Sequence, residues 1–154
     1  MKLRTNALLA LLAVLVVAVG VTCAQPMPTP APEHPFYMHA LSDLRLARAY
    51  LERPGNHGTE RNEDHAIDEI DAAINEIKHA SIDDGKDLHD HPPIDASLGW
   101  TDRFHKALDL LDKTYRDCSR EEDDPATRGL QARILGHLDA ARHFTRHAME
   151  DAGH

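Results

Sequence analysis

The chain is short of cysteine and of positive charge, and each shortage excludes a class of protein. Only Cys23 and Cys118 occur among its 154 residues, so a fold stapled by several disulfides is excluded. Lys and Arg number 17 against 26 Asp and Glu, giving a formal net charge of −9. Nucleic acids and anionic membrane surfaces attract clusters of basic residues. The charge balance therefore argues against both as partners.

Several chemical motifs are missing as well. No stretch alternates apolar and polar residues with period two, so no β-strand is predicted. A C-x-x-C-H sequence is absent, which excludes covalent attachment of a c-type haem. There is no glycine-rich phosphate loop, and no nucleophile can be placed beside a base. We therefore predict that the protein is not an enzyme.

The first 24 residues have the pattern of a signal peptide. Lys2 and Arg4 precede an unbroken apolar run over 7–21, and small residues follow at 22–24. The run is shorter than the roughly 20 residues of a membrane-spanning helix, so no membrane insertion of the mature chain is expected. The residues before Cys23 lack the usual leucine of a lipoprotein signal, which disfavours lipidation there. The sequence predicts cleavage after Ala24 and an exported protein, periplasmic or extracellular.

The exported part divides into an arm and a helical domain. Residues 25–35 contain five of the nine prolines and predict an extended linker. Apolar residues then recur at steps of three and four over four segments: 36–53, 62 to about 82–85, 98–120 and 124–149. Two connections between these segments are short and one is longer. The pattern predicts an all-α, up-down four-helix bundle over residues 36–150.

The last segment is predicted to be the core helix of that bundle. Asp124 is a candidate N-cap and Pro125 suits the first helical position. One face of the segment is apolar and has His137 at its middle. A stripe of small residues would admit a neighbouring backbone; it consists of Gly129, Gly136 and Ala140.

Histidine is unusually abundant for an exported acidic protein, with 12 residues, all beyond the predicted cleavage site. His143 and His147 are spaced i, i+4, which places two imidazoles one turn apart on one side of a helix and suits Zn, Cu or Ni. The alternative is a pair of solvated side chains between Arg142 and Arg146, whose charges would oppose a cation. His137 is either a satisfied core residue or a further ligand.

The longer connection is a second candidate cation site. Residues 83–93 hold four carboxylates and two imidazoles, His89 and His91, and they do not match an EF-hand loop. The alternative for this segment is a solvated loop.

Two kinds of iron site have a partial match in the sequence. The E-x-x-H sequence of Glu76 and His79 lies opposite the isoleucine face of its segment and has no second copy, which argues against a di-iron centre. In outline the chain is similar to cytochrome b562-like bundles, which implies a b-type haem. Its axial ligands would be Met38 or His39 early in the first helix and His143 or His147 late in the last.

Four strings resemble an uncharacterised family of small exported bacterial four-helix proteins. They are ALSDLRLARAYL at 40–51, AIDEIDAAINEIK at 66–78, IDDGKDLHDHPP at 82–93 and RGL at 128–130. The resemblance covers nearly the whole mature chain. It implies the fold and export, and because the family has no assigned activity it carries over no functional residue.

The leading functional prediction is an exported, non-enzymatic protein that binds a transition-metal ion through histidines. The candidate ligands are His143, His147, His137, His89 and His91. The first alternative is a structural or interaction module of the cell envelope or of an extracellular assembly, whose partner would be a second copy or an envelope protein. The second alternative is a b-type haem electron carrier.

Overall fold

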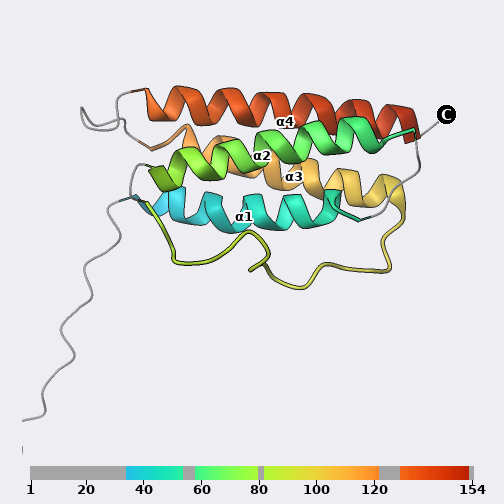
Figure 1. The fold of residues 1–154 in the computed structure, drawn as a ribbon, viewed down its shortest axis with the longest axis horizontal. Coiled ribbons are helices and arrows are strands. Elements are labelled where there is room, and N and C mark those ends of the chain that lie inside the picture. Colours follow the sequence, from blue (N-terminus) through green and yellow to red (C-terminus); the bar gives the residue numbers. More distant parts are fainter. Residues whose placement is uncertain (1–33, 54–57, 80–81, 122–128, 153–154) are drawn as a thin grey trace, which may run out of the picture. The chain divides into compact units, whose positions relative to one another are not determined.

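Four helices account for most of the residues that the computed structural model describes. These residues are 34–53, 58–79, 82–121 and 129–152. The helices are α1 (Pro35–Leu51), α2 (Glu60–His79), α3 (Trp100–Cys118) and α4 (Leu130–Ala152), and this part of the chain contains no strand (Figure 1). The prediction of an all-α four-helix fold is confirmed. The predicted signal peptide and residues 25–33 of the linker lie outside the described residues, and Pro35 already belongs to α1.

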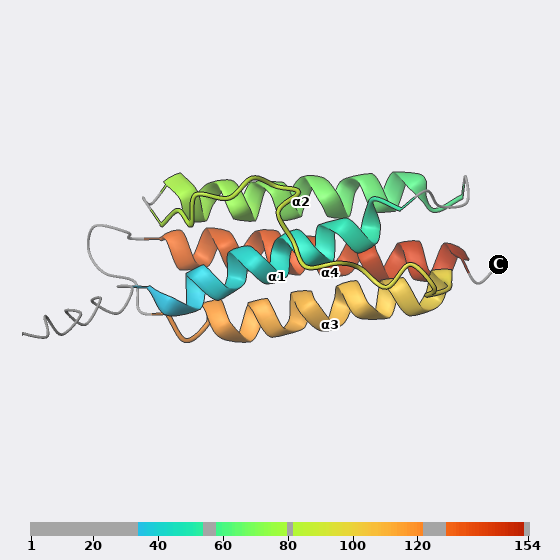
Figure 2. The same ribbon diagram turned by 90° about the horizontal axis from the view of Figure 1, so that it is seen from below.

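Contacts between helix ends fix the direction of each helix. At one end, Glu121 after α3 accepts a hydrogen bond from the backbone N–H of Phe36 in α1, and Gln131 in α4 donates to the Cys118 carbonyl. At the other end, Asn62 in α2 donates to Asp151 in α4. Helices α1 and α4 therefore run in one direction and α2 and α3 in the other (Figures 1 and 2). The simple up-down order was wrong at the α2–α3 step.

The connection between α2 and α3 explains this order. Residues 82–99 pass back along the outer side of α1, so α3 begins at the end of the bundle where α2 began (Figure 2). Arg45 and Arg53 of the first helical region donate hydrogen bonds to this crossover. Three of its apolar side chains pack against the core: Leu88, Ile94 and Leu98. The crossover therefore acts as a cover over α1.

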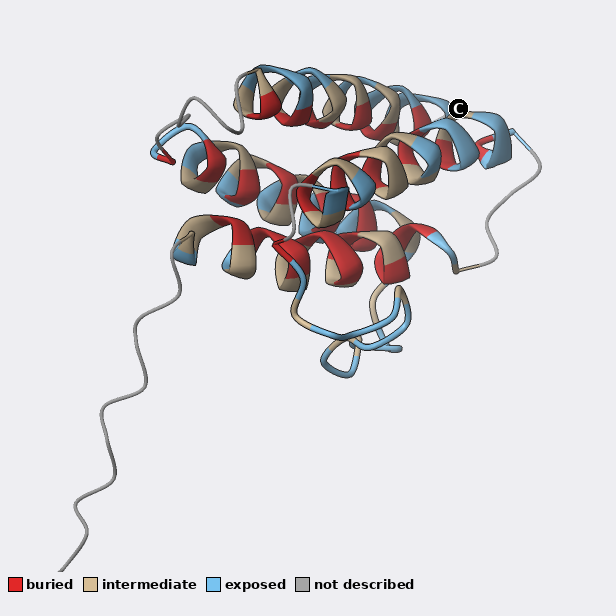
Figure 3. Cartoon of the chain, turned by 60° about the vertical axis from the view of Figure 1, so that its left-hand side comes forward, coloured by how far each residue is buried: buried red, intermediate tan, exposed pale blue. Residues whose placement is uncertain are grey.

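Helix α1 is consequently the most enclosed helix. It packs against α2 and α3, and the crossover covers its remaining side. Nine of its 17 residues are buried, namely Tyr37, Ala40, Leu41, Leu44, Arg45, Ala47, Ala49, Tyr50 and Leu51. They are not confined to one face (Figure 3). The prediction that the last segment is the core helix was therefore wrong, because that role belongs to α1.

Helix α4 buries a single stripe and leaves its opposite side in solvent (Figure 3). The buried residues are Leu130, Ile134, Leu138, Ala141, Thr145 and Ala148. The helix begins at Leu130 because Gly129 has a φ of +79°, outside the helical region. The proposed cap at 124–125 lies outside the described residues. Gly136 is exposed with open space around it, so the small residues do not admit a neighbouring helix of the same chain.

The patterns of the middle two helices were predicted more closely. Helix α2 buries Ala66, Ile70, Ala73, Ile74 and Ile77, and α3 buries Phe104, Leu111 and Cys118 together with the unpredicted Arg103 and Thr114. Helix α2 begins at Glu60, two residues before the predicted start at residue 62. The Thr59 carbonyl accepts the backbone N–H groups of Asn62 and Glu63 there. Within the described residues, no helix has the length and apolar character needed to cross a membrane.

Candidate functional site

His143 and His147 lie on the outer side of α4, and both are exposed. Their ring centroids are 4.4 Å apart and the rings meet edge to face. Nδ1 of His147 is 3.2 Å from Oε2 of Glu150. A carboxylate that holds one ring nitrogen orients the other toward a metal ion. The helix thus presents two adjacent imidazoles to solvent, with an acidic residue beside them.

The arginine next to this pair does not face it with a free charge. Arg142 forms ion pairs with Asp112 of α3 and Asp139 of α4, and its guanidinium lies 5.0 Å from the Tyr115 ring centroid. It is therefore turned toward α3 and largely neutralised. Only Arg146, which is exposed, remains as a nearby positive charge in the described residues. Arg142 therefore contributes little repulsion to a cation bound at His143 and His147.

The pair supplies two ligands and not a complete coordination sphere. Across 34–53, 58–79, 82–121 and 129–152, no group of three or more His, Cys, Asp or Glu side chains is placed to hold a metal ion. On α2, the His65 ring packs 5.0 Å from the Phe144 ring, and His143 packs against the same Phe144 ring at 5.6 Å. Further ligands would have to come from water or from another molecule.

His137 lies at the seam between α4 and α2 rather than in the core. Its Nδ1 is 2.7 Å from Oε2 of Glu69, and the two side chains are 31% and 30% exposed. An imidazole paired with a carboxylate satisfies its hydrogen-bonding requirement. The structure therefore provides the single partner that a satisfied histidine needs, and it does not bring His137 to the His143–His147 pair.

The crossover uses its carboxylates to bind the protein itself. Asp84 accepts two hydrogen bonds from Arg45, at 2.6 and 2.7 Å, and the Arg45 side chain is fully buried. Burial alone would raise the pKa of Asp84, but the hydrogen bonds from Arg45, the backbone N–H of Lys86 and the charge of Arg45 together lower that pKa below its usual value. Asp84 therefore neutralises a buried guanidinium and is not available to a cation.

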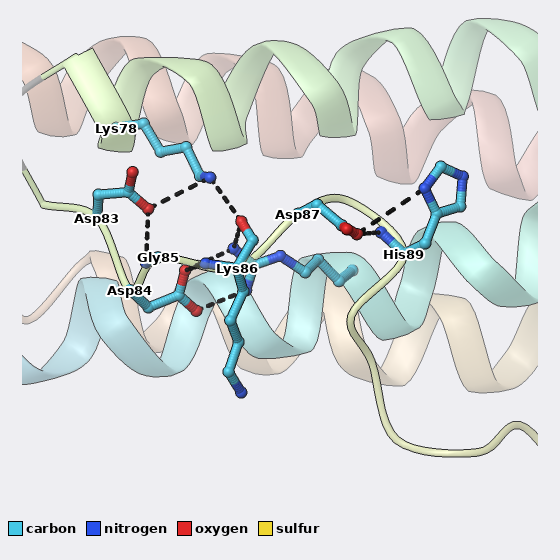
Figure 4. Close-up of polar contacts among 8 residues, drawn as sticks. Lys78, Asp83, Asp84, Gly85, Lys86, Asp87 and His89 are labelled. Atoms are coloured by element: carbon cyan, nitrogen blue, oxygen red, sulfur yellow. Dashed lines mark hydrogen bonds and ion pairs between the residues drawn. The ribbon is translucent and has the colours of Figure 1, made fainter.

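The neighbouring acidic residues shape turns. Asp83 accepts the backbone N–H of Gly85 at 3.0 Å, and that bond, followed by Lys78, lowers the pKa of Asp83 (Figure 4). Gly85 has a φ of +71°, which favours glycine. Asp87 accepts the backbone N–H of His89 at 2.7 Å. These contacts match the loop alternative for residues 83–93.

His89 and His91 do not share a site with the α4 histidines. Nδ1 of His91 is 2.8 Å from the Pro92 carbonyl, and His89 has its two nitrogens 4.0 Å from Glu52 and Asp87. The crossover lies along α1, whereas α4 packs on α2 and α3. One ion cannot bind both pairs.

The topology separates the predicted haem ligands. Because α1 and α4 run in the same direction, the start of α1 and the end of α4 lie at opposite ends of the bundle (Figure 1). Met38 and His39 therefore cannot face His143 or His147 across a haem. That hypothesis required the two helices to be antiparallel.

Sequence reasoning missed a buried polar cluster where α1 ends and α2 and α3 begin. Arg103 and Glu63 are 2% and 4% exposed, and Nη2 of Arg103 donates to Oε2 of Glu63 at 3.0 Å. Arg103 also donates to the carbonyls of Tyr50 and Arg53. Forty residues separate Arg103 from Glu63, so no spacing rule connects them. The cluster joins three helix ends and is structural.

Trp100 covers this cluster from outside. The Arg103 guanidinium carbon is 4.8 Å from the Trp100 ring centroid. A pocket of about 40 Å³ beside them is lined by Arg53, Leu98, Trp100 and Arg103. Arg53 already donates to the Ala96 carbonyl, and the pocket is too small to hold a drug-sized ligand, which needs roughly 300 Å³ or more.

Cys118 is free and buried in the apolar core. Burial, with smaller contributions from Asp117 and Glu121, raises the pKa of its thiol to about 12. A thiol that stays protonated is neither a nucleophile nor a metal ligand. Its role is packing.

Comparison of the chain with protein-family models, with curated proteins and with solved structures gave no match. The resemblance to small exported bacterial four-helix proteins thus rests on the sequence strings alone.

Proposed function

We propose that this is an exported, non-enzymatic helical-bundle protein that binds a transition-metal ion, Zn, Cu or Ni, through His143 and His147. One observation carries the proposal. Two exposed imidazoles one helical turn apart have ring centroids separated by 4.4 Å. Imidazole nitrogen suits all three ions, and the proposal of export rests on the N-terminal sequence pattern.

The remaining candidate histidines are assigned other roles in this proposal. His137 forms a polar link between α2 and α4 through Glu69, and His89 and His91 belong to the loop that covers α1. A site with two protein ligands leaves coordination positions open. Binding is then exchangeable, which fits a protein that buffers or carries an ion.

Protons compete with the metal at such a site. An imidazole must be neutral to ligate, so acidification releases the ion. The affinity is therefore expected to be lower at acidic than at neutral pH. Carboxylate-dominated binding would fall less on acidification, because carboxylates protonate at lower pH.

The proposal is tested by calorimetric titration of Zn, Cu and Ni into the untagged protein. The protein is purified in the processed form that the producing cell makes. Replacing both histidines in His143→Ala/His147→Ala is expected to weaken binding by at least about tenfold. The matched control is His89→Ala/His91→Ala, which removes the two crossover imidazoles and should leave the affinity unchanged. Equal affinity in the wild type and the first variant would refute the proposal.

A second candidate function is a protein-interaction module. The observation that favours it is the outer face of α4, where Ala132 and Gly136 are exposed. Small exposed residues allow another helix to approach closely. In this case metal-free protein would assemble as its concentration rises, and replacement of His143 and His147 would not change the assembly.

A further inference from the structure

We propose that the metal site on α4 is completed by a second copy of this chain, with one zinc ion held between His143 and His147 of each copy. This inference rests on the proposed function and deepens it. It identifies the ion as zinc and the partner as the protein itself. The exported protein would then dimerise in response to zinc.

One copy of the chain offers zinc an incomplete set of ligands. Zinc in closed protein sites is almost always tetrahedral with four ligands. His143 and His147 provide two. Glu150 is held at Nδ1 of His147, and within the described residues no group of three or more His, Cys, Asp or Glu side chains is placed to hold a metal ion. A two-fold axis through the ion would bring the same two imidazoles from each copy, giving four nitrogens with no further residue type.

The His143–His147 pair is exposed to solvent. At roughly 100° per residue, His143 lies on the side of α4 opposite the buried Ala141. His147 follows one turn later, with its side chain 48% exposed. The pair therefore points away from α2 and α3. An ion bound there is accessible to a second protein molecule.

The outer side of α4 carries small residues next to the His143–His147 pair. Ala132, Gly136 and His143 follow one another at steps of four and seven along the outer side of α4, and all are exposed. A Cβ atom added at Gly136 would meet nothing within 4 Å. The backbone of α4 is thus open to close approach on the N-terminal side of the pair. A second α4 helix can cross there without displacing large side chains.

Charge explains why the dimer needs the ion. Each chain has a formal net charge of −9, so two copies repel one another. The outer side of α4 also carries exposed Asp139 and Glu150. A divalent cation bound between the copies offsets this repulsion. It also takes the place of the water molecules that would otherwise bind the four imidazoles. Without metal, the two copies should separate.

Sedimentation velocity of the untagged protein with zinc chloride tests the inference. The monomer is expected without zinc, with maximal dimer near one ion per two chains, and a chelator should restore the monomer. His143→Ala/His147→Ala should remain monomeric, whereas the control His89→Ala/His91→Ala should dimerise as the wild type does. Calorimetry on the same samples reports ion binding separately.

The outcomes separate the two proposals. Zinc binding by His143 and His147 without any dimer would overturn this inference and leave the proposed function standing. Failure to bind zinc, copper or nickel would overturn both. Dimerisation that persists in His143→Ala/His147→Ala would show that the histidines do not bridge the copies.

A third variant tests the geometry of approach. Gly136→Gln places a longer side chain on the open part of the outer face and leaves both histidines in place. We expect zinc to bind each chain while the dimer weakens at least tenfold. Unchanged dimerisation would overturn the assignment of this face.

Discussion

Helices α1 and α4 both carry apolar residues at helical spacing, yet they differ in how much of each helix is buried. Nine of 17 residues are buried in α1 and six of 23 in α4. The difference arises from the crossover, which covers the side of α1 that would otherwise face solvent, while nothing in the described residues covers the corresponding side of α4. The polar side chains of the two helices therefore serve different purposes.

Arg45 and His143 illustrate this difference. Arg45 is fully buried and needs Asp84 because an unpaired buried charge is costly. His143 is exposed and contributes little to stability, so it can be used for binding without a cost to the fold. Polar residues around α1 hold the bundle together, whereas those on the outer side of α4 are available to a ligand.

The largest expected effect tests the buried charge beside α1. Arg45→Met leaves the Asp84 carboxylate, which is 11% exposed, without its partner. We expect a loss of about 3–5 kcal/mol in the free energy of unfolding, measured by urea denaturation. The matched change on α4 is Arg133→Met, whose guanidinium is 52% exposed beside Glu76; its expected loss is below about 1 kcal/mol. Equal losses of unfolding free energy in the two variants would contradict the difference between α1 and α4.

Apolar truncation should follow the same order with a somewhat smaller effect. Leu44 on α1 is fully buried, and Leu44→Ala is expected to cost roughly 2–5 kcal/mol because it leaves a cavity. Leu135 on α4 is only partly buried. Leu135→Ala should cost about 1 kcal/mol in the same denaturation experiment. A larger loss at Leu135 would show that α4, and not α1, is the central helix.

The link between Asp84 and Arg45 should depend on pH. The pKa of the Asp84 carboxyl is lowered in the folded state. The ion pair therefore stabilises the protein above the unfolded-state pKa of about 3.9, and this stabilisation is lost as pH falls through the folded-state pKa. Asp84→Asn is expected to cost about 2 kcal/mol at neutral pH. The gap between wild type and variant should narrow below about pH 4. A gap that stays constant down to that acidity would exclude this ion pair as its source.

Two glycines should give the smallest effects, with opposite signs. Gly136 in α4 has open space and no positive φ, so Gly136→Ala should stabilise the protein by about 0.5–1 kcal/mol. Gly85 in the crossover has a φ of +71°, and Gly85→Ala should destabilise it by about 1 kcal/mol. Thermal unfolding of both variants measures the difference. Changes of the same sign would contradict the assigned backbone conformations.

The sequence was informative wherever the signal was local. The isoleucine spacing of α2 identified its buried face, and the i, i+4 spacing placed His143 and His147 side by side. Both depend only on helical geometry. The candidate site could therefore be predicted as a pair, although the sequence could not say which other side chains would join it.

Features that depend on long-range packing were not predicted. The apolar spacing of 36–53 predicted a helix, but not the burial of α1 beyond that stripe, for example at Arg45 and Ala49, because that burial depends on neighbouring segments. The direction of α3 depends on the course of residues 82–99, which no periodicity encodes. The pairing of Arg103 with Glu63 joins residues far apart in the sequence. His137 fell on the predicted core face, but its pairing with Glu69 places it at the edge.

Paramagnetic broadening by Cu²⁺ in an amide NMR spectrum of the untagged protein tests the central claim most directly, because it locates the bound ion on the chain. At substoichiometric copper, we predict the loss of amide signals around His143 and His147 while those around His89 and His91 persist. Loss of the crossover signals first, with the α4 signals intact, would contradict the claim that the outer face of α4 carries the function.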